Sequence, residues 1–83
     1  MKLSNALRQR IAYLAKLKAN SLKDLSKKSN VSYSTLTSFM IGKTRILTLS
    51  TLYNLCNGLD ISLYNFFDDP IFKDVVDEDE KNL

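Results

Sequence analysis

The chain has 83 residues, enough for one compact domain with its own core but too few for a second lobe. No apolar run approaches the roughly 20 residues that cross a bilayer. The first residues lack the apolar stretch of a signal peptide, so we expect a cytoplasmic protein without a membrane segment. The sequence has no histidine, one cysteine and no glycine-rich phosphate loop, which excludes a zinc site and histidine-based catalysis. We therefore expect no enzyme activity and no bound metal or cofactor.

Charge is distributed unevenly along the chain. Residues 1–45 contain ten lysines and arginines and one acidic residue, Asp24, whereas residues 46–83 contain two basic and eight acidic residues. A basic half suits a protein that binds a polyanion, although lysines that only solubilise helices give the same pattern. The charge pattern alone leaves both interpretations open.

The first helix is predicted at about residues 4–18, because apolar residues recur there at steps of three and four. One apolar stripe is formed by Leu3, Leu7, Ile11, Leu14 and Ala15. The basic residues Arg8, Arg10 and Lys16 fall outside this stripe. The helix is therefore amphipathic, and we expect its basic side chains to point away from the core.

The second helix is predicted at about residues 22–28. Ser21 and Asp24 have the pattern of a capping box, in which a hydroxyl and a carboxylate accept hydrogen bonds from free amides at a helix start. Asn30 follows this helix, and asparagine tolerates the left-handed conformation that a tight turn between helices requires.

The third helix is predicted at about residues 33–41, with Ser32 as its N-cap and Gly42 as its left-handed C-terminal stop. Leu36 and Phe39 lie three positions apart and are expected to face the core. The outward positions are Tyr33, Ser34, Thr37 and Ser38.

Two more helices complete the predicted bundle. The fourth begins after Thr48, and its inner face consists of Leu49, Leu52, Leu55, Cys56 and Leu59. The fifth begins after Ser62 and closes the core with its phenylalanines. We expect a domain at residues 1–67 and an acidic tail at residues 68–83 that is partly docked or disordered, with mobility from Asp74 to Glu80. Half-buried packing is expected for Tyr13, Tyr53 and Tyr64.

Two short helices joined by a turn of three or four residues, the second with small polar side chains outward, form the geometry that enters the major groove of DNA. Residues 21–42 read SLKDLSKKSNVSYSTLTSFMIG. With the leucine spacing of residues 49–63, residues 6–67 resemble the Cro/phage-repressor (XRE-type) helix-turn-helix family, whose pattern runs T-Q-x-x-L-A-x-x-x-G-V-S-x-x-T-I-S-x-x-E-x-G. The resemblance implies an all-α, compact five-helix bundle like that of lambda repressor. It also implies a sequence-specific transcriptional regulator whose third helix, at about residues 33–41, reads the major groove.

The resemblance further implies which residues contact double-stranded DNA. Base edges would be read by Tyr33, Ser34, Thr37 and Ser38. Phosphates would be contacted by the amide of Leu22 at the start of the second helix, and by Ser32, Lys43, Thr44 and Arg45. Phosphate contacts set the register of the protein on DNA, and base contacts set the sequence that it prefers.

Two pairs of residues depart from the family pattern. Leu22 and Tyr33 stand where glutamine is common, so the bidentate contact of glutamine with adenine is not expected. Ala15 and Met40 stand where many relatives have an arginine–glutamate ion pair. Losing one member of a buried pair would strand a charge at a cost of roughly 3–5 kcal/mol. Because both members are exchanged, we expect a dry apolar contact there.

Two functions remain open on this evidence. The first is a transcriptional regulator that binds an inverted-repeat operator as a homodimer. Its expected interface comprises the fifth helix with Phe66, Phe67, Ile71 and Phe72. The second is an antitoxin-like module whose helices or acidic tail hold a toxin partner, with DNA binding secondary.

Overall fold

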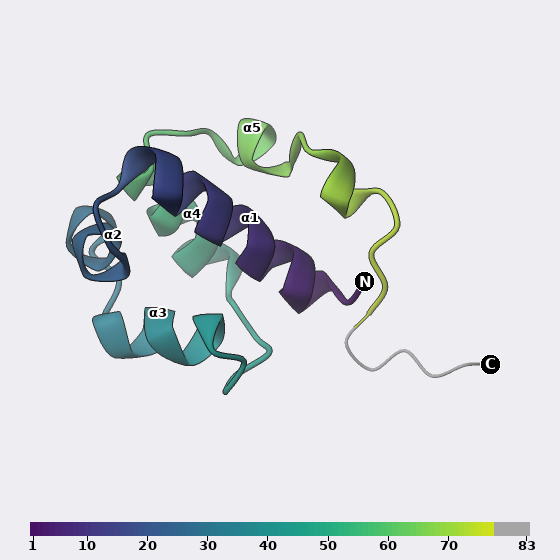
Figure 1. The fold of residues 1–83 in the computed structure, drawn as a ribbon, viewed down its shortest axis with the longest axis horizontal. Coiled ribbons are helices and arrows are strands. Elements are labelled where there is room, and N and C mark those ends of the chain that lie inside the picture. Colours follow the sequence, from purple (N-terminus) through teal and green to yellow (C-terminus); the bar gives the residue numbers. More distant parts are fainter. Residues whose placement is uncertain (78–83) are drawn as a thin grey trace.

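The computed structural model describes residues 1–77, which fold into five α-helices and one short 3-10 helix (Figure 1). In chain order these are α1 (Leu3–Lys18), α2 (Leu22–Ser29), α3 (Tyr33–Met40), α4 (Leu49–Gly58), α5 (Leu63–Phe67) and η1 (Pro70–Phe72). The predicted all-α bundle is confirmed, and the bounds predicted for the first three helices lie within one residue of those observed. No helix in residues 1–77 is both long enough and apolar enough to cross a membrane.

Hydroxyl side chains begin four of the helices, as the sequence predicts. The oxygens of Ser21, Ser32, Thr48 and Ser62 each accept a hydrogen bond from the amide three residues later, at 3.0–3.1 Å. At α2, Oδ2 of Asp24 also accepts from the amide of Asn20 at 3.1 Å, one residue before the N-cap. Such a cap stabilises its helix by about 1 kcal/mol, so these helix starts are encoded locally.

The core is formed by the inner faces of all five α-helices. Its completely buried side chains include Ile11 of α1, Leu25 of α2, Leu36 of α3, Leu55 of α4 and Phe66 of α5. Burying one such side chain contributes roughly 1.5–3 kcal/mol. Cys56 also lies in this core, as predicted, and burial raises the pKa of its thiol, which keeps it protonated and unreactive.

α2 and α4 approach each other closely at Gly58, the last residue of α4. A Cβ atom on this residue would lie 2.9 Å from the nitrogen and 3.0 Å from the Cα of Ser29. Rotating a side chain cannot relieve contacts with backbone atoms, so the position requires glycine. The close approach holds α2, the first helix of the helix-turn-helix pair, against the core.

The chain after α5 returns to the N-terminus of α1 (Figure 1). Phe72 packs against the core, and the amide of Val76 donates to the carbonyl of Met1 at 3.0 Å. The amide of Leu3 donates in turn to the carbonyl of Val76 at 3.0 Å. Because α1 has no side-chain N-cap, this carbonyl satisfies one of its free amides.

The expected mobility from Asp74 to Glu80 stays a prediction, because Val76 makes these backbone hydrogen bonds but residues 78–83 lie outside the described part of the chain. Tyr13 and Tyr53 are 57% and 52% exposed, in agreement with half-buried packing, whereas Tyr64 is 80% exposed and contradicts it. Phe66 occupies the inner side of the short helix α5, which leaves Tyr64 on the outside.

Candidate nucleic-acid interface

The turn between α2 and α3 sets the orientation of α3. Asn30 adopts a left-handed φ of 56°, as the sequence predicts, and the amide of Val31 donates to the carbonyl of Ser26 at 3.2 Å. Val31 is buried, and Leu36 and Phe39 anchor the inner side of α3. The other side of α3 therefore points away from the core.

The four side chains expected to read bases share this outer side. Tyr33, Ser34, Thr37 and Ser38 occupy positions that lie together on one helix face. Tyr33 and Ser34 are exposed, and the other two are partly exposed. The Thr37 hydroxyl lies 2.8 Å from the carbonyl of Tyr33 and 3.2 Å from that of Ser34, so its proton is directed to the backbone. Thr37 presents a methyl group and an acceptor, whereas the others present hydroxyl groups.

The start of α2 combines a free amide with an anionic side chain. Leu22 is the first residue of α2, where amides have no acceptor within the helix, and its side chain packs against the core. In the same turn, the hydrogen bond from the amide of Asn20 lowers the pKa of the Asp24 carboxyl, with a further contribution from Lys28. Nζ of Lys28 lies 3.1 Å from the carboxylate. A phosphate that binds the Leu22 amide would therefore lie near an ion pair whose two charges cancel.

Ser32 is occupied by its role as a helix cap. Its Oγ accepts from the amide of Thr35 at 3.0 Å and lies 2.8 Å from the Thr35 hydroxyl oxygen. A phosphate contact by Ser32 would therefore share the oxygen that begins α3.

The loop after α3 folds back on the end of that helix. Gly42 has a φ of 84°, as predicted for its stop position. The amides of Lys43 and Thr44 both donate to the carbonyl of Ser38, at 2.9 and 3.3 Å. The side chains of Lys43, Thr44 and Arg45 are exposed. The loop is thus tied to the helix that carries the expected base-reading residues.

Arg8 of α1 reinforces this connection, a role that its position in the sequence does not indicate. Its Nε donates to the carbonyl of Phe39 at 2.6 Å, and its Nη2 donates to the carbonyl of Thr44 at 2.9 Å. The guanidinium also lies 4.8 Å from the centre of the Phe39 ring. Arg8 lies off the apolar stripe of α1, as expected, and its guanidinium packs onto the end of α3. Backbone carbonyls near a helix end can accept further donors, as the Phe39 carbonyl does besides the amide of Gly42, but the sequence does not indicate which side chain supplies them.

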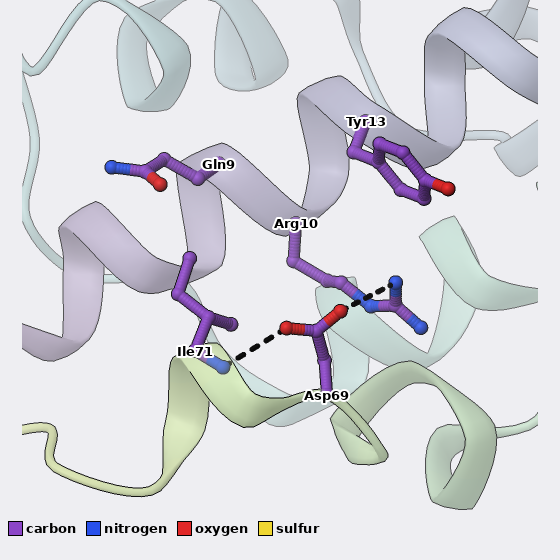
Figure 2. Close-up of a pocket in the computed structure, with 5 residues that line it drawn as sticks. All are labelled: Gln9, Arg10, Tyr13, Asp69 and Ile71. Carbon is purple, nitrogen blue, oxygen red and sulfur yellow. Dashed lines mark hydrogen bonds and ion pairs between the residues drawn. The ribbon is translucent and has the colours of Figure 1, made fainter.

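Arg10 makes an equivalent set of contacts on the other side of α1. Its Nε and Nη2 donate to the carbonyls of Phe66 and Asn65 in α5, at 2.8 and 2.9 Å. Figure 2 shows its ion pair with Asp69, in which Nη1 lies 3.3 Å from Oδ2, beside a surface pocket of about 210 Å³. Asp69 also accepts from the amide of Ile71 at 2.9 Å, at the start of η1. Its neutralised charge makes Arg10 part of the fold and not of a polyanion-binding surface.

Ala15 of α1 and Met40 at the end of α3 are apolar residues on the border of the same surface pocket. Ala15 is buried, Met40 packs against the core, and both line one surface pocket that Leu22 also borders. No charged partner is therefore stranded at these positions in the described structure.

These features define a helix-turn-helix protein in which α2 and α3 form the motif and the outer side of α3 is exposed. The model of the Cro/C1-type HTH DNA-binding domain matches residues 10–69, and the chain belongs to this family. No curated protein and no solved structure gave a significant match. Arg8, the η1 helix and the segment that caps α1 lie outside the matched residues. Among residues 1–77 there is no group of three or more side chains suited to hold a metal ion.

Proposed function

We propose that the protein is a sequence-specific transcriptional regulator whose helix α3 enters the major groove of double-stranded DNA. The two-sided character of α3 carries this proposal: Leu36 and Phe39 are buried on one side, and hydroxyl-bearing side chains lie on the other. A helix anchored in this way presents hydrogen-bonding groups to base edges. This function requires access to the DNA and therefore a cytoplasmic location in a prokaryotic cell.

Base and phosphate contacts are divided between α3 and the segments beside it. Tyr33, Ser34 and Ser38 reach base edges, and Thr37 offers its methyl group to the groove. The amide of Leu22 meets a phosphate at the N-terminus of α2, and Ser32 approaches a phosphate while it caps α3. Beyond the other end of α3, the loop of Lys43, Thr44 and Arg45 contacts the backbone further along the duplex.

A single head of this size makes few contacts, so two copies are inferred to bind an inverted repeat with half-sites about 34 Å apart. Phe66 is completely buried and Phe72 packs against the core, so neither is available for the interface expected from the sequence. The apolar surface of α5 that remains consists of Tyr64 and Phe67, which are 80% and 40% exposed. A footprint confined to one half-site would contradict the dimer.

The test begins with selection of bound DNA from a random pool, followed by comparison of two variants. Ser34→Ala removes a base contact, so it should relax the preference at one base pair per half-site, worth on the order of 1–3 kcal/mol, and leave the salt slope unchanged. Arg45→Ala removes a phosphate contact, so it should weaken binding to every sequence and lower the salt slope by about 1. Circular dichroism checks that both variants remain folded.

The two variants must differ for the proposal to stand. If Ser34→Ala and Arg45→Ala weakened binding by the same factor on selected and random DNA, α3 would not be reading bases. The absence of any selected sequence would remove the proposed function altogether.

A second candidate, the antitoxin-like module, is favoured by apolar side chains around the loop after α3. Ile41, Ile46 and Leu49 are 76%, 82% and 67% exposed, so the expectation that Leu49 lies on the inner face of the fourth helix is wrong. Phosphate contacts do not require such surface, and clustered exposed apolar residues mark protein contacts. Co-purification of a small basic partner that Ile46→Ser and Leu49→Ser abolish, but Arg45→Ala does not, would support this candidate.

A further inference from the structure

Arg8 connects two segments that the proposed function assigns to different DNA contacts. Its Nε binds the carbonyl of Phe39 in the last turn of α3, and its Nη2 binds the carbonyl of Thr44 in the following loop. Phe39 belongs to the helix that enters the groove, and Thr44 lies between the two basic side chains expected to meet phosphates. One guanidinium thus spans the base-reading and phosphate-contacting segments.

Contacts on two sides fix the orientation of the Arg8 guanidinium. Its Nη1 donates to Oδ1 of Asn5 at 2.9 Å and lies 3.2 Å from Oγ of Ser4, both one turn earlier in α1. The Phe39 ring lies against the guanidinium on the other side. A planar group with several donors in fixed directions can join two carbonyls and hold their separation. Lysine has the same charge, but its donors share one freely rotating nitrogen, so it cannot hold the two carbonyls at the fixed separation that the guanidinium sets.

We propose that Arg8 is a positioning residue for DNA binding. It holds the loop of Lys43, Thr44 and Arg45 at a fixed position relative to α3, so that the loop meets phosphates while α3 lies in the groove. The inference rests on the proposed function and adds to it a residue outside the family match. Arg8 acts through the loop and does not itself need to touch DNA, since its donors are directed to protein oxygens.

Arg10 provides a matched control within the same helix. It also joins carbonyls near a helix end to α1, but those carbonyls belong to Asn65 and Phe66 of α5. Arg8→Lys and Arg10→Lys therefore make the same chemical change and keep the same charge. Only the first change loosens the loop after α3.

The experiment measures binding of the full chain to its selected DNA and to random DNA over a range of salt concentrations. We expect Arg8→Lys to weaken binding to both by about tenfold and to lower the salt slope by about 1–2, since each phosphate contact contributes about 0.9 to the slope. Arg10→Lys should leave both quantities unchanged at protein concentrations where the protein is a dimer, because its contacts lie at α5, which carries the proposed dimer surface, and not at the loop after α3. Hydrogen exchange should show faster exchange at the amides of Lys43 and Thr44 in Arg8→Lys only, because these amides close the loop onto Ser38.

A double variant separates an effect through the loop from a general loss of stability. If Arg8 acts by placing Arg45, then Arg8→Lys should weaken binding much less in an Arg45→Ala background than in the wild type. Equal factors in the two backgrounds would overturn the inference, as would equal losses in Arg8→Lys and Arg10→Lys. Either result leaves the proposed function standing, whereas a wild-type protein that selects no DNA would remove both.

Discussion

The two sides of α1 are held by similar chemistry but differ in what they leave exposed. The front face, defined here as α2, α3 and the loop to Arg45, carries hydroxyl and basic side chains that point outward. The rear face, defined as residues 63–77, exposes Asp68, Lys73, Asp74 and Asp77, but its Asp69 carboxylate binds Arg10 of α1 and the amide of Ile71. α1 lies between these faces and gives one arginine to each (Figure 1). Basic residues close together in sequence can therefore serve opposite roles.

The rear face needs these inward contacts because its helices are short. α5 has five residues and η1 has three, and isolated helices of such lengths do not form in water. The rings of Phe66, Phe67 and Phe72 pack against one another with centroids 5.0–5.9 Å apart. Arg10 adds donors for the carbonyls at the end of α5. The rear face is thus stabilised by long-range contacts, whereas the front helices begin with local caps.

The largest expected effect is on the rear face, from Arg10→Met. Methionine keeps part of the packing volume but removes the arginine donors from the Phe66 carbonyl and from Oδ2 of Asp69. The Asn65 carbonyl loses one of its two donors, because it still accepts from the amide of Asp68. We expect the free energy of unfolding to fall by about 3 kcal/mol, because the Arg10 side chain is only 10% exposed. Chemical denaturation measures this loss. DNA affinity should stay unchanged when it is measured well below the unfolding midpoint and at protein concentrations where the variant is a dimer. A selective loss of affinity under these conditions would contradict the separation of the two faces.

The next effect concerns the apolar contact on the front face. Met40→Glu places a carboxylate beside Ala15, and we expect it to lower the free energy of unfolding by about 2 kcal/mol, since the group is partly desolvated. Adding Ala15→Arg should recover at least about 1 kcal/mol, because an ion pair can form in the pocket that both residues line. Unfolding of the wild type, both single variants and the double variant completes the cycle. Simple additivity would show that the two positions are not coupled.

The front face was largely predictable from the sequence because its determinants are local. Ser21, Ser32 and Asn30 lie at the positions where a cap or a left-handed turn was expected, and the structure confirms each. The contacts that hold the rear face were not predictable in this way. The partners of Arg10 lie 55–59 residues away in sequence, and apolar periodicity does not indicate such distances.

The residues of the candidate site also fall into two groups, those whose position the sequence predicts and those whose role it does not. Exposure of Tyr33 and Ser34 follows from the periodicity that buries Leu36, so their place on the outer side of α3 could be read from the sequence. The role of Arg8 could not, because helical spacing shows only that it lies off the apolar stripe. Its acceptors in α3 and in the following loop are backbone carbonyls, which every residue carries and which the sequence therefore does not reveal.

The third prediction concerns the segment that returns to α1. Deletion of residues 74–83 removes the carbonyl of Val76 from the first turn of α1, and we expect a loss of about 1 kcal/mol, the usual contribution of a helix cap. Deletion of residues 78–83 keeps this carbonyl and should leave the free energy of unfolding unchanged. Thermal or urea unfolding of both deletions gives the comparison. Equal stability of the two deletions would mean that the Val76 contact does not support α1.

The shorter deletion also tests the effect of the acidic end on DNA binding. It removes Glu78, Asp79 and Glu80 with one lysine, so repulsion of phosphates decreases. Non-specific affinity should therefore rise at low salt, and the difference should disappear as salt screens the charges. An unchanged affinity at low salt would show that these residues do not weaken binding.

The smallest expected effect returns to the front face, at the start of α2. The pKa of the Asp24 carboxyl is lowered first by the hydrogen bond from the Asn20 amide and then by Lys28. A carboxyl with a depressed pKa in the folded state contributes stability above its unfolded pKa, near 4, and this contribution is lost as pH falls through the folded value. Asp24→Asn keeps the shape and an acceptor oxygen but removes the charge. Its deficit in the free energy of unfolding should therefore be constant at neutral pH and should shrink as pH falls below 4.

Lys28→Gln separates the two causes of the lowered pKa. The ion pair is partly exposed and screened by salt, so Lys28→Gln should remove only the part of the Asp24 effect that depends on salt. The bond from the Asn20 amide should persist in that variant, because the backbone geometry at Ser21 sets it. A deficit in Asp24→Asn that stays the same from pH 7 to well below the folded pKa would mean that the ionised carboxylate does not support this turn. In that case the cap of Ser21 alone would stabilise the start of α2, and the front face would have one local stabilising contact fewer.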